Sequence, residues 1–153
     1  AEGKGIQTAM TFSDPSMLEY FHSNVNEVLG TGVDLLFCNE KEALLWSGEA
    51  DLAAACTAMR TKAKRFAITR GSKGALLFDG SNFIDIDPHS VKAVDTNGAG
   101  DMFAGAFLYA LTSGRDFVTA GNLASLASAT VVSSFGPRLE ASMHAPIARK
   151  ILE

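Results

Sequence analysis

Short apolar runs alternate along the chain with longer segments in which apolar residues recur at helical spacing. A short apolar run between turn residues is typical of a strand, and the helical recurrence is typical of an amphipathic helix. The predicted strands cover residues 6–12, 33–38, 65–69, 75–78 and 82–86. The predicted helices cover residues 16–29, 49–64 and 116–134, one that begins at residue 39, and one that ends near residue 112.

Residues with strong cap or turn preferences mark several of these boundaries. Ser13 or Asp14 can cap a helix whose first position is Pro15, and Asn39 opens a helix with acids in its first turn. Asp79 and Gly80 are typical of a hairpin turn. We therefore predict one α/β domain over residues 1–153, with a mostly parallel sheet and an antiparallel hairpin at its margin.

Composition and charge exclude several classes of function. The chain has 153 residues, 47% of them hydrophobic, and a net charge of −4 with 13 Lys plus Arg, which argues against a nucleic-acid-binding surface. Its one local basic cluster, Lys62, Lys64 and Arg65, is better explained as a solvated helix end. Neither a membrane span nor a signal peptide is evident, so we predict a cytoplasmic protein without membrane partners.

The cysteines and the first residue add two smaller expectations. Cys38 and Cys56 lie in apolar surroundings without metal-ligand spacing, so we expect buried thiols in a reducing compartment. The chain starts at Ala1 and soon enters an apolar stretch, from which we expect a fragment or a processed chain.

A glycine-rich turn, "NGAG", stands directly before a predicted helix. Gly98, Ala99 and Gly100 would let backbone amides at a helix N-terminus approach an anion closely. Phe103 stands where a dinucleotide-binding fingerprint needs a third glycine, and the segment from Gly71 lacks the order of a Walker A loop. One alternative is a tight connection that Asp101 caps; the other is an anion site whose neighbouring carboxylate accepts a proton from a hydroxyl.

The stretch "DTNGAGDMFAGAF", residues 95–107, resembles the second signature of the ribokinase, or PfkB-type, carbohydrate kinase family, which is approximately D-T-x-G-A-G-D-x-F. The resemblance implies a three-layer ribokinase-like fold with Asp101 as the catalytic base. It also implies that the amides from Gly98 to Asp101, those of Ala99 and Gly100 included, form the anion hole for the transferred phosphoryl group. Asp95 and Asn97 would lie at a monovalent-cation loop, Asn97 through its carbonyl.

Two further segments match the family in the same order. "NEKE" implies that Asn39 approaches the nucleotide phosphates and that Glu42 organises magnesium through water, although helix capping would also explain both residues. "ITRGSKGALL" resembles the nucleotide-binding strand and turn, with Thr69, Gly71 and Gly74 at the matching places, although an ordinary glycine turn would also explain it.

Later residues are less specific. "ASLASATVVSSFG" corresponds to a helix and loop near the adenine and the cation, which implies contacts from Ser125 and Gly136, although helix packing explains Ser125 as well. His22, His89 and His144 share no spacing or acidic partner, so we expect surface or capping roles for them. Trp46 is expected in the core.

The resemblance implies an ATP- and Mg²⁺-dependent kinase, with K⁺ as a further cofactor, that phosphorylates a hydroxyl of a sugar or nucleoside. The segments "FLYALTSG" and "SDP" are most similar to the adenosine kinase-like branch. Only the family's C-terminal portion is represented, without the N-terminal part and the lid. We therefore expect the missing N-terminal part of the same protein as a partner, and the isolated chain to be inactive. A non-catalytic nucleotide-binding module and a purely structural α/β domain are the alternatives.

Overall fold

The computed structural model describes residues 4–153, and its contacts divide the chain into two compact units. The N-terminal unit comprises Ala1–Thr69 and Phe78–Phe83, and the C-terminal unit comprises Arg70–Leu77 and Ile84–Glu153. The N-terminal unit contains β1 (Ala9–Thr11), α1 (Pro15–Leu29), β2 (Val33–Asn39), α2 (Glu40–Ser47), α3 (Leu52–Met59) and β3 (Ala63–Thr69). The C-terminal unit contains a 3₁₀ turn (Gly71–Lys73), α4 (Ala99–Thr112), α5 (Phe117–Val132) and α6 (Ala141–Leu152).

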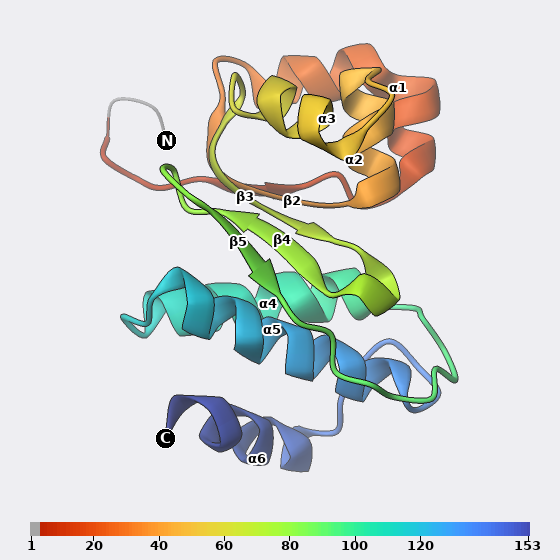
Figure 1. The fold of residues 1–153 in the computed structure, drawn as a ribbon, viewed down its shortest axis with the longest axis vertical. Coiled ribbons are helices and arrows are strands. Elements are labelled where there is room, and N and C mark those ends of the chain that lie inside the picture. Colours follow the sequence, from red (N-terminus) through yellow and green to blue (C-terminus); the bar gives the residue numbers. More distant parts are fainter. Residues whose placement is uncertain (1–3) are drawn as a thin grey trace. The chain divides into compact units, whose positions relative to one another are not determined.

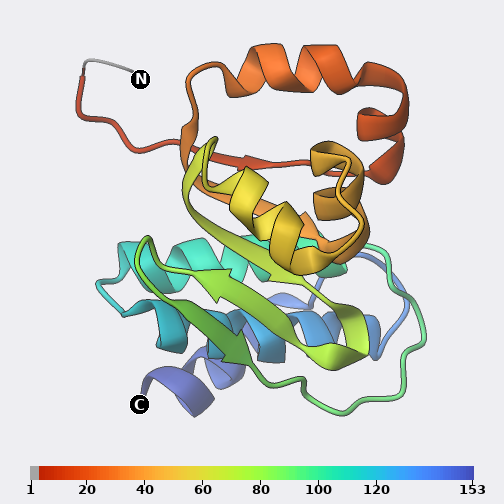
Figure 2. The same ribbon diagram turned by 45° about the horizontal axis from the view of Figure 1, so that its top comes forward.

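The strands form one sheet in the order β1-β2-β3-β4-β5, where β4 is Ala75–Phe78 and β5 is Phe83–Ile86 (Figure 1). The pairs β1-β2 and β2-β3 are parallel. The strands β4 and β5 are joined by a turn too short for a crossover connection, so they form an antiparallel hairpin, which Figure 2 shows. The predicted α/β fold, with a mostly parallel sheet and a hairpin at its margin, is confirmed. The single domain over residues 1–153 stays a prediction.

Strands β2 and β3 are buried over much of their length, as expected for central strands of a parallel sheet, whereas Ala9 and Thr11 of β1 are exposed. Leu36 pairs in register with Phe66, and both side chains are completely buried. Helices α1, α2 and α3 follow one another around these strands, and α2 packs against both α1 and α3. Burial of these side chains supplies the main driving force for this part of the fold.

Carboxylates begin two of these helices. Asp14 is the N-cap of α1 and accepts a hydrogen bond from Ser16 N at 2.8 Å, which decides between Ser13 and Asp14. Asp51 caps α3 in the same way, with Ala54 N at 2.9 Å. Residues 49–64 were predicted as one helix, and this was wrong at both ends. The cap at Asp51 delays its start, and Ala63 and Lys64 leave the helix to pair with β2 as part of β3.

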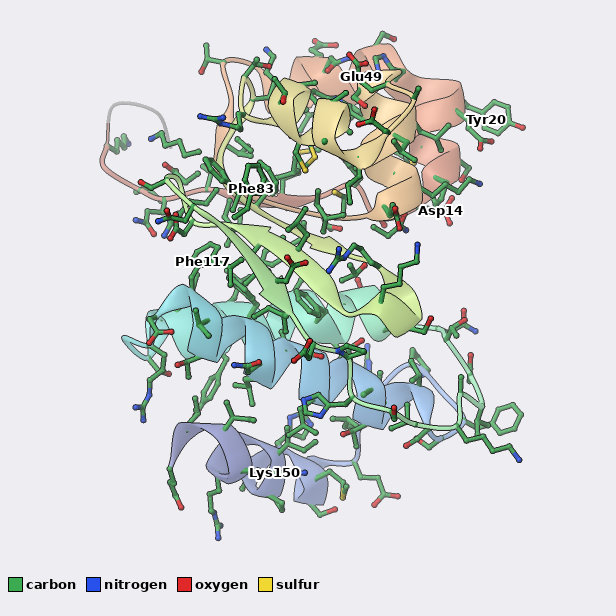
Figure 3. The ribbon with its side chains drawn as sticks, viewed as in Figure 1. Asp14, Tyr20, Glu49, Phe83, Phe117 and Lys150 are labelled. Carbon is green, nitrogen blue, oxygen red and sulfur yellow. The ribbon has the colours of Figure 1, made fainter. Side chains whose placement is uncertain are left out.

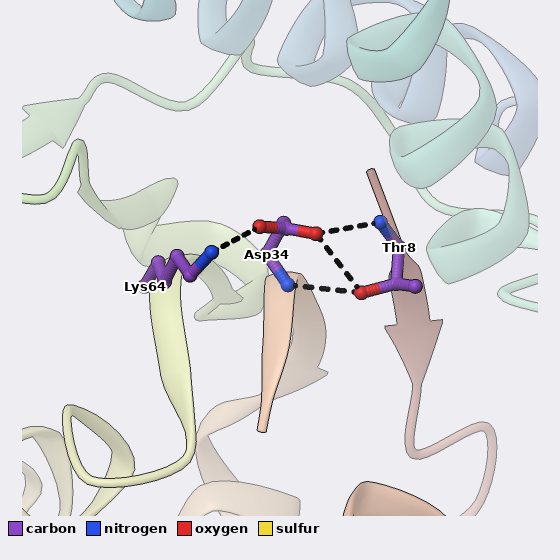
Figure 4. A network of polar contacts seen from close by, with 3 residues as sticks. All are labelled: Thr8, Asp34 and Lys64. Atoms are coloured by element: carbon purple, nitrogen blue, oxygen red, sulfur yellow. Dashed lines mark hydrogen bonds and ion pairs between the residues drawn. The ribbon is translucent and has the colours of Figure 1, made fainter. Parts of the chain in front are cut away.

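A polar network ties the amino-terminal ends of the parallel strands together (Figure 4). Asp34 accepts hydrogen bonds from Thr8 N at 2.8 Å, from Thr8 Oγ1 at 3.1 Å and from Lys64 Nζ at 2.8 Å. Thr8 Oγ1 in turn accepts one from Asp34 N at 3.2 Å. The Lys64 ammonium, more than any other group, lowers the pKa of Asp34 to about 2. These contacts fix the register of β1, β2 and β3 at the sheet edge opposite to Asn39.

In the C-terminal unit, α4 and α5 run side by side and α6 packs against α5 (Figure 1). Phe107 of α4 meets Phe117 of α5 edge to face, with ring centroids 4.9 Å apart. Helix α6 is not evident from the sequence, because Pro146 inside it removes a backbone donor and interrupts the usual helical signal. Ile147, the buried residue of α6, supplies its apolar contact. Within residues 4–153, no helix combines the length and apolar character needed to cross a membrane.

Candidate functional site

Several predicted site residues of the N-terminal unit lie at the carboxyl ends of its parallel strands. Asn39 and Thr69 end β2 and β3 and pair with each other in the sheet register. Asp14 begins α1 just beyond β1 (Figure 3). In open α/β sheets, ligands bind beyond the carboxyl ends of the strands. The structure therefore brings Asn39 and Thr69 together, with Glu42 one helical turn further along.

Asn39 and Glu42 form a reciprocal capping box at the start of α2. Asn39 Oδ1 accepts a hydrogen bond from Glu42 N at 2.8 Å, and Glu42 Oε2 accepts one from Asn39 N at 2.9 Å. The capping alternative therefore describes these bonds correctly. Each side chain nevertheless has a second polar atom that the capping box does not use. The Nδ2 end of Asn39 and the Oε1 atom of Glu42 lie outside the capping box, and these are the atoms that suit a phosphate oxygen and a magnesium-bound water.

Glu42 is an acid held in a low-dielectric environment. Glu42 is only 4% exposed, and this burial is the main cause that raises the pKa of its carboxyl. The hydrogen bond from Asn39 N acts in the opposite direction, and the charge of Asp14 raises the pKa further. A bound cation would favour the ionised form. Glu42 therefore fits the role of a carboxylate that a metal would stabilise, and Asp14, expected only as a cap, contributes to its electrostatics.

We expect Glu42→Gln to flatten the dependence of stability on pH. Because the folded-state pKa of Glu42 is raised, the native state holds its proton more tightly than the unfolded chain does. Its stability contribution is therefore present below the unfolded-state pKa and is lost as pH rises through the folded-state pKa. Glutamine has no such loss. Thermal unfolding of the complete protein across acidic to neutral pH measures this.

The matched control is Glu40→Gln, which removes a charge from the same first turn of α2. If Glu42→Gln and the unsubstituted protein give parallel pH profiles, the ionisation of Glu42 has no linkage to folding and the assignment fails.

In the C-terminal unit, α4 begins at the predicted anion hole without a side-chain cap. Gly98 is its N-cap, with φ of +75°, and a Cβ there would lie 2.3 Å from Pro137 O. No other residue fits this position without displacing one of the two loops. Met102 N to Gly98 O, at 2.9 Å, is the first bond that closes a helical turn. The amides of Gly100 and Asp101 consequently have no acceptor inside the helix.

Gly100 and Asp101 are both exposed at this helix start. A Cβ at Gly100 would meet no heavy atom within 4 Å, so its absence leaves room on the solvent side rather than relieving a contact. Ser128 Oγ of α5 donates to Ala99 O at 3.1 Å and holds the first turn in place. Free amides, the helix dipole and open space are the features by which a helix N-terminus can bind an anion.

Asp95 joins the loop before α4 to the loop after α5. Its Oδ1 accepts from Asn97 N at 3.0 Å, and its Oδ2 accepts from Gly136 N at 3.1 Å. These two bonds, the one from Asn97 first, lower the pKa of Asp95. The three residues predicted to surround a monovalent cation are therefore together. Their backbone carbonyls would be the oxygen ligands of such a cation, and the Asp95 carboxylate connects the two loops.

In the turn with Gly71 and Gly74, a close contact between two backbone segments requires one of the two glycines. Gly74 has φ of +83°, and a Cβ there would lie 2.0 Å from Ile86 O. By contrast, a Cβ at Gly71 would meet nothing within 4 Å. Ser125 is buried, and its Oγ donates to Asp87 O at 3.0 Å. This bond favours the packing role of Ser125 that the sequence left open.

A groove of about 780 Å³ in the C-terminal unit includes residues that the sequence did not connect with the site. It is lined by α4, α5, α6 and the loop before α6, and it contains Asp101, Tyr109, Arg138 and His144. His144 had been expected at the surface or at a cap. No spacing in the sequence links it to Asp101, because the undetected helix α6 brings it there. In the part of the chain that is described, no three His, Cys, Asp or Glu side chains group as a metal site.

A family model for the pfkB family carbohydrate kinase matches residues 1–143. The chain belongs to the pfkB family. A cytidine kinase from Thermococcus kodakarensis is 35% identical over 117 residues, which are 73% of this chain and 42% of that protein. The ribokinase-like and adenosine kinase-like resemblance seen in the sequence is confirmed.

Two solved structures agree with this membership of the pfkB family. The adenosine kinase from Sinorhizobium meliloti has a TM-score of 0.89 and 33% identity, over 95% of this chain and 45% of that one. A probable sugar kinase from Rhizobium etli CFN 42 has a TM-score of 0.88 and 31% identity, over 95% of this chain and 44% of that one. The chain thus spans less than half the length of each of these pfkB-family relatives.

Proposed function

We propose that the complete protein transfers the γ-phosphoryl group of ATP to a hydroxyl group of a sugar or nucleoside. The observation that carries this proposal is the uncapped start of α4, where exposed amides adjoin the Asp101 carboxylate. An anion site next to a proton acceptor suits a reaction in which a phosphate group meets a hydroxyl. Membership of the pfkB family supports kinase activity in general.

In the proposed reaction, Asp101 accepts the proton of the acceptor hydroxyl while the hydroxyl oxygen attacks the γ-phosphorus. The bond between that phosphorus and the β–γ bridging oxygen breaks, and ADP leaves with the bond's electrons. The amides of Gly98, Gly100 and Asp101 hold the equatorial oxygens of the moving phosphoryl group, where charge is distributed. Because they are fixed by the turn, they need little rearrangement during transfer. The Ala99 amide, which was expected to join them, already donates to Thr96 O at 3.3 Å.

The remaining site residues would hold the nucleotide and its cations. Asn39 would donate from Nδ2 to a phosphate oxygen, and Glu42 would accept from water bound to magnesium. Magnesium at this position would offset the charge of the phosphate oxygens. Thr69 and the turn with Gly71 and Gly74 would contact the nucleotide, and Asn97 and Gly136 would offer carbonyls to K⁺.

The test is a transfer assay on the purified complete protein with ATP, Mg²⁺ and a panel of sugars and nucleosides. We expect mass spectrometry to find at least one acceptor that gains a phosphoryl group, and residues 1–153 alone to show no robust turnover. The match covers less than half of each relative, so the acceptor site would be completed by the rest of the protein.

Thermal stabilisation by ATP without transfer to any acceptor would support a non-catalytic nucleotide-binding module instead. Robust turnover by the isolated chain would contradict the view that the remaining part is required.

A further inference from the structure

Arg70 is a residue to which neither the sequence signatures nor the proposed reaction gives a role. It immediately precedes the nucleotide-binding turn, which we define as residues 71–74. Its backbone encloses this turn, because Arg70 N donates to Gly74 O at 2.8 Å and Arg70 O accepts from Lys73 N at 3.1 Å. Arg70 therefore contacts both ends of the turn through its main chain alone.

The guanidinium group of Arg70 folds back over the same turn. Nη2 lies 2.7 Å from Asp85 Oδ1, and 3.3 Å and 3.4 Å from the carbonyl oxygens of Ala75 and Lys73. One nitrogen thus joins the last residue of the 3₁₀ turn, the first residue of β4 and a side chain of β5. A planar group with fixed donors can hold three such oxygens in one relative geometry.

The burial of the Arg70 side chain, with Nε left unpaired, distinguishes its contact with Asp85 from a simple surface ion pair. The Arg70 side chain is only 19% exposed, and among residues 4–153 its Nε is the one buried side-chain nitrogen or oxygen without a hydrogen-bond partner. Asp85, in contrast, is 74% exposed, so the ion pair itself gains little in water. A buried donor left without a partner is unfavourable, which points to a role that offsets it.

We propose that Arg70 is a positioning residue that fixes the nucleotide-binding turn and thereby sets the affinity for ATP. Gly74 holds one side of the turn by its close approach to Ile86 O, and the Arg70 guanidinium holds the other side. Since Nη2 contacts Lys73 O, Ala75 O and Asp85, the guanidinium is placed to act on a nucleotide through the geometry of the turn. The inference rests on the proposed function, because it takes the turn as the nucleotide site.

The test compares Arg70→Gln with the unsubstituted complete protein. We expect the KM and the directly titrated Kd for ATP each to rise about tenfold, with kcat and the acceptor KM changed by less than about threefold, because only nucleotide binding loses preorganisation. Arg70→Lys keeps a charged donor near the three oxygens and should recover part of the ATP affinity. A general loss of structure would not separate the two substrates in this way.

Arg115→Gln is the matched control, because Arg115 in the same unit also donates from Nη2 to a carbonyl, that of Leu152, at 3.0 Å. It should leave the Kd for ATP unchanged. If Arg70→Gln does not fold, Asp85→Ala removes the Oδ1 acceptor 2.7 Å from Nη2 and should still weaken ATP binding about threefold.

Unchanged ATP affinity in the folded Arg70 or Asp85 variants would overturn the proposal, as would equal losses for both substrates. The Kd measurement separates this proposal from the proposed function. A protein that binds ATP but transfers nothing refutes the kinase reaction, while a tenfold weaker Kd in Arg70→Gln still supports the role of the turn.

Discussion

In the complete protein, Asp101→Asn is expected to lower kcat by roughly 10²- to 10⁴-fold, the usual contribution of a general base. Asparagine has nearly the same shape but cannot accept the hydroxyl proton. The Asp101 side chain is exposed and makes no cap bond at the start of α4, so the fold and the ATP affinity should persist. Steady-state kinetics with thermal unfolding as a parallel measurement would show a fall in kcat without a fall in Tm.

Asp116→Asn is the control for this prediction. Asp116 also begins a helix of the C-terminal unit, where it accepts from Thr119 N at 2.7 Å as the cap of α5. Asparagine caps helices nearly as well, so kcat and stability should both change little. Near-normal turnover in Asp101→Asn would remove Asp101 from the chemistry and leave it as an ordinary residue of a helix start.

The second large effect is expected for Gly98→Ala, which should both destabilise the C-terminal unit and lower kcat. An alanine in the left-handed conformation costs about 1–2 kcal/mol, and its Cβ would also overlap Pro137 O at 2.3 Å. The loop after α5 or the start of α4 must therefore move. Misplacing catalytic groups by about 1 Å can cost on the order of 10²-fold in rate. Thermal unfolding and kcat measure the two consequences.

Gly100→Ala supplies the contrast within the same turn. It adds a methyl group in open space on a helical residue, so stability should stay the same or rise by up to about 1 kcal/mol, whereas the loss in Gly98→Ala should be large. Equal stability of the two variants would show that the contact with Pro137 yields readily. The anion hole would then depend less on Gly98 than the geometry indicates.

Local sequence signals were enough to predict the elements whose boundaries are set by capping or turn residues. Asp14 with Pro15, Asn39, and the hairpin at Asp79 all act through hydrogen bonds to neighbouring residues, so the sequence shows them directly. The predicted end of the helix over residues 49–64 was wrong, because pairing of Ala63 with Val33 outweighs local helix propensity. Helix α6 was not predicted, because Pro146 lies inside it and proline usually interrupts a helix.

The residues of the candidate site also fall into those that local sequence signals predict and those that depend on contacts remote in sequence. The glycines of residues 98–100 could be singled out from spacing, but the reason for Gly98 lies in Pro137, which is remote in sequence. The placement of Asp95 and Gly136 at a common cation site was predicted only through resemblance to a family, and their hydrogen bond was not predicted. Arg70 carries no pattern at all, because its importance depends on carbonyl directions that only the folded turn defines.

The capping box at Asn39 has a consequence for how selective this end of the site would be. An unrestrained asparagine amide can rotate to offer either its oxygen or its nitrogen, and so can adapt to donors and acceptors alike. In this chain the oxygen is committed to Glu42 N, and the folded helix fixes which end faces outward. Asn39 would therefore favour incoming groups that can accept a hydrogen bond from Nδ2 and disfavour groups that can only donate.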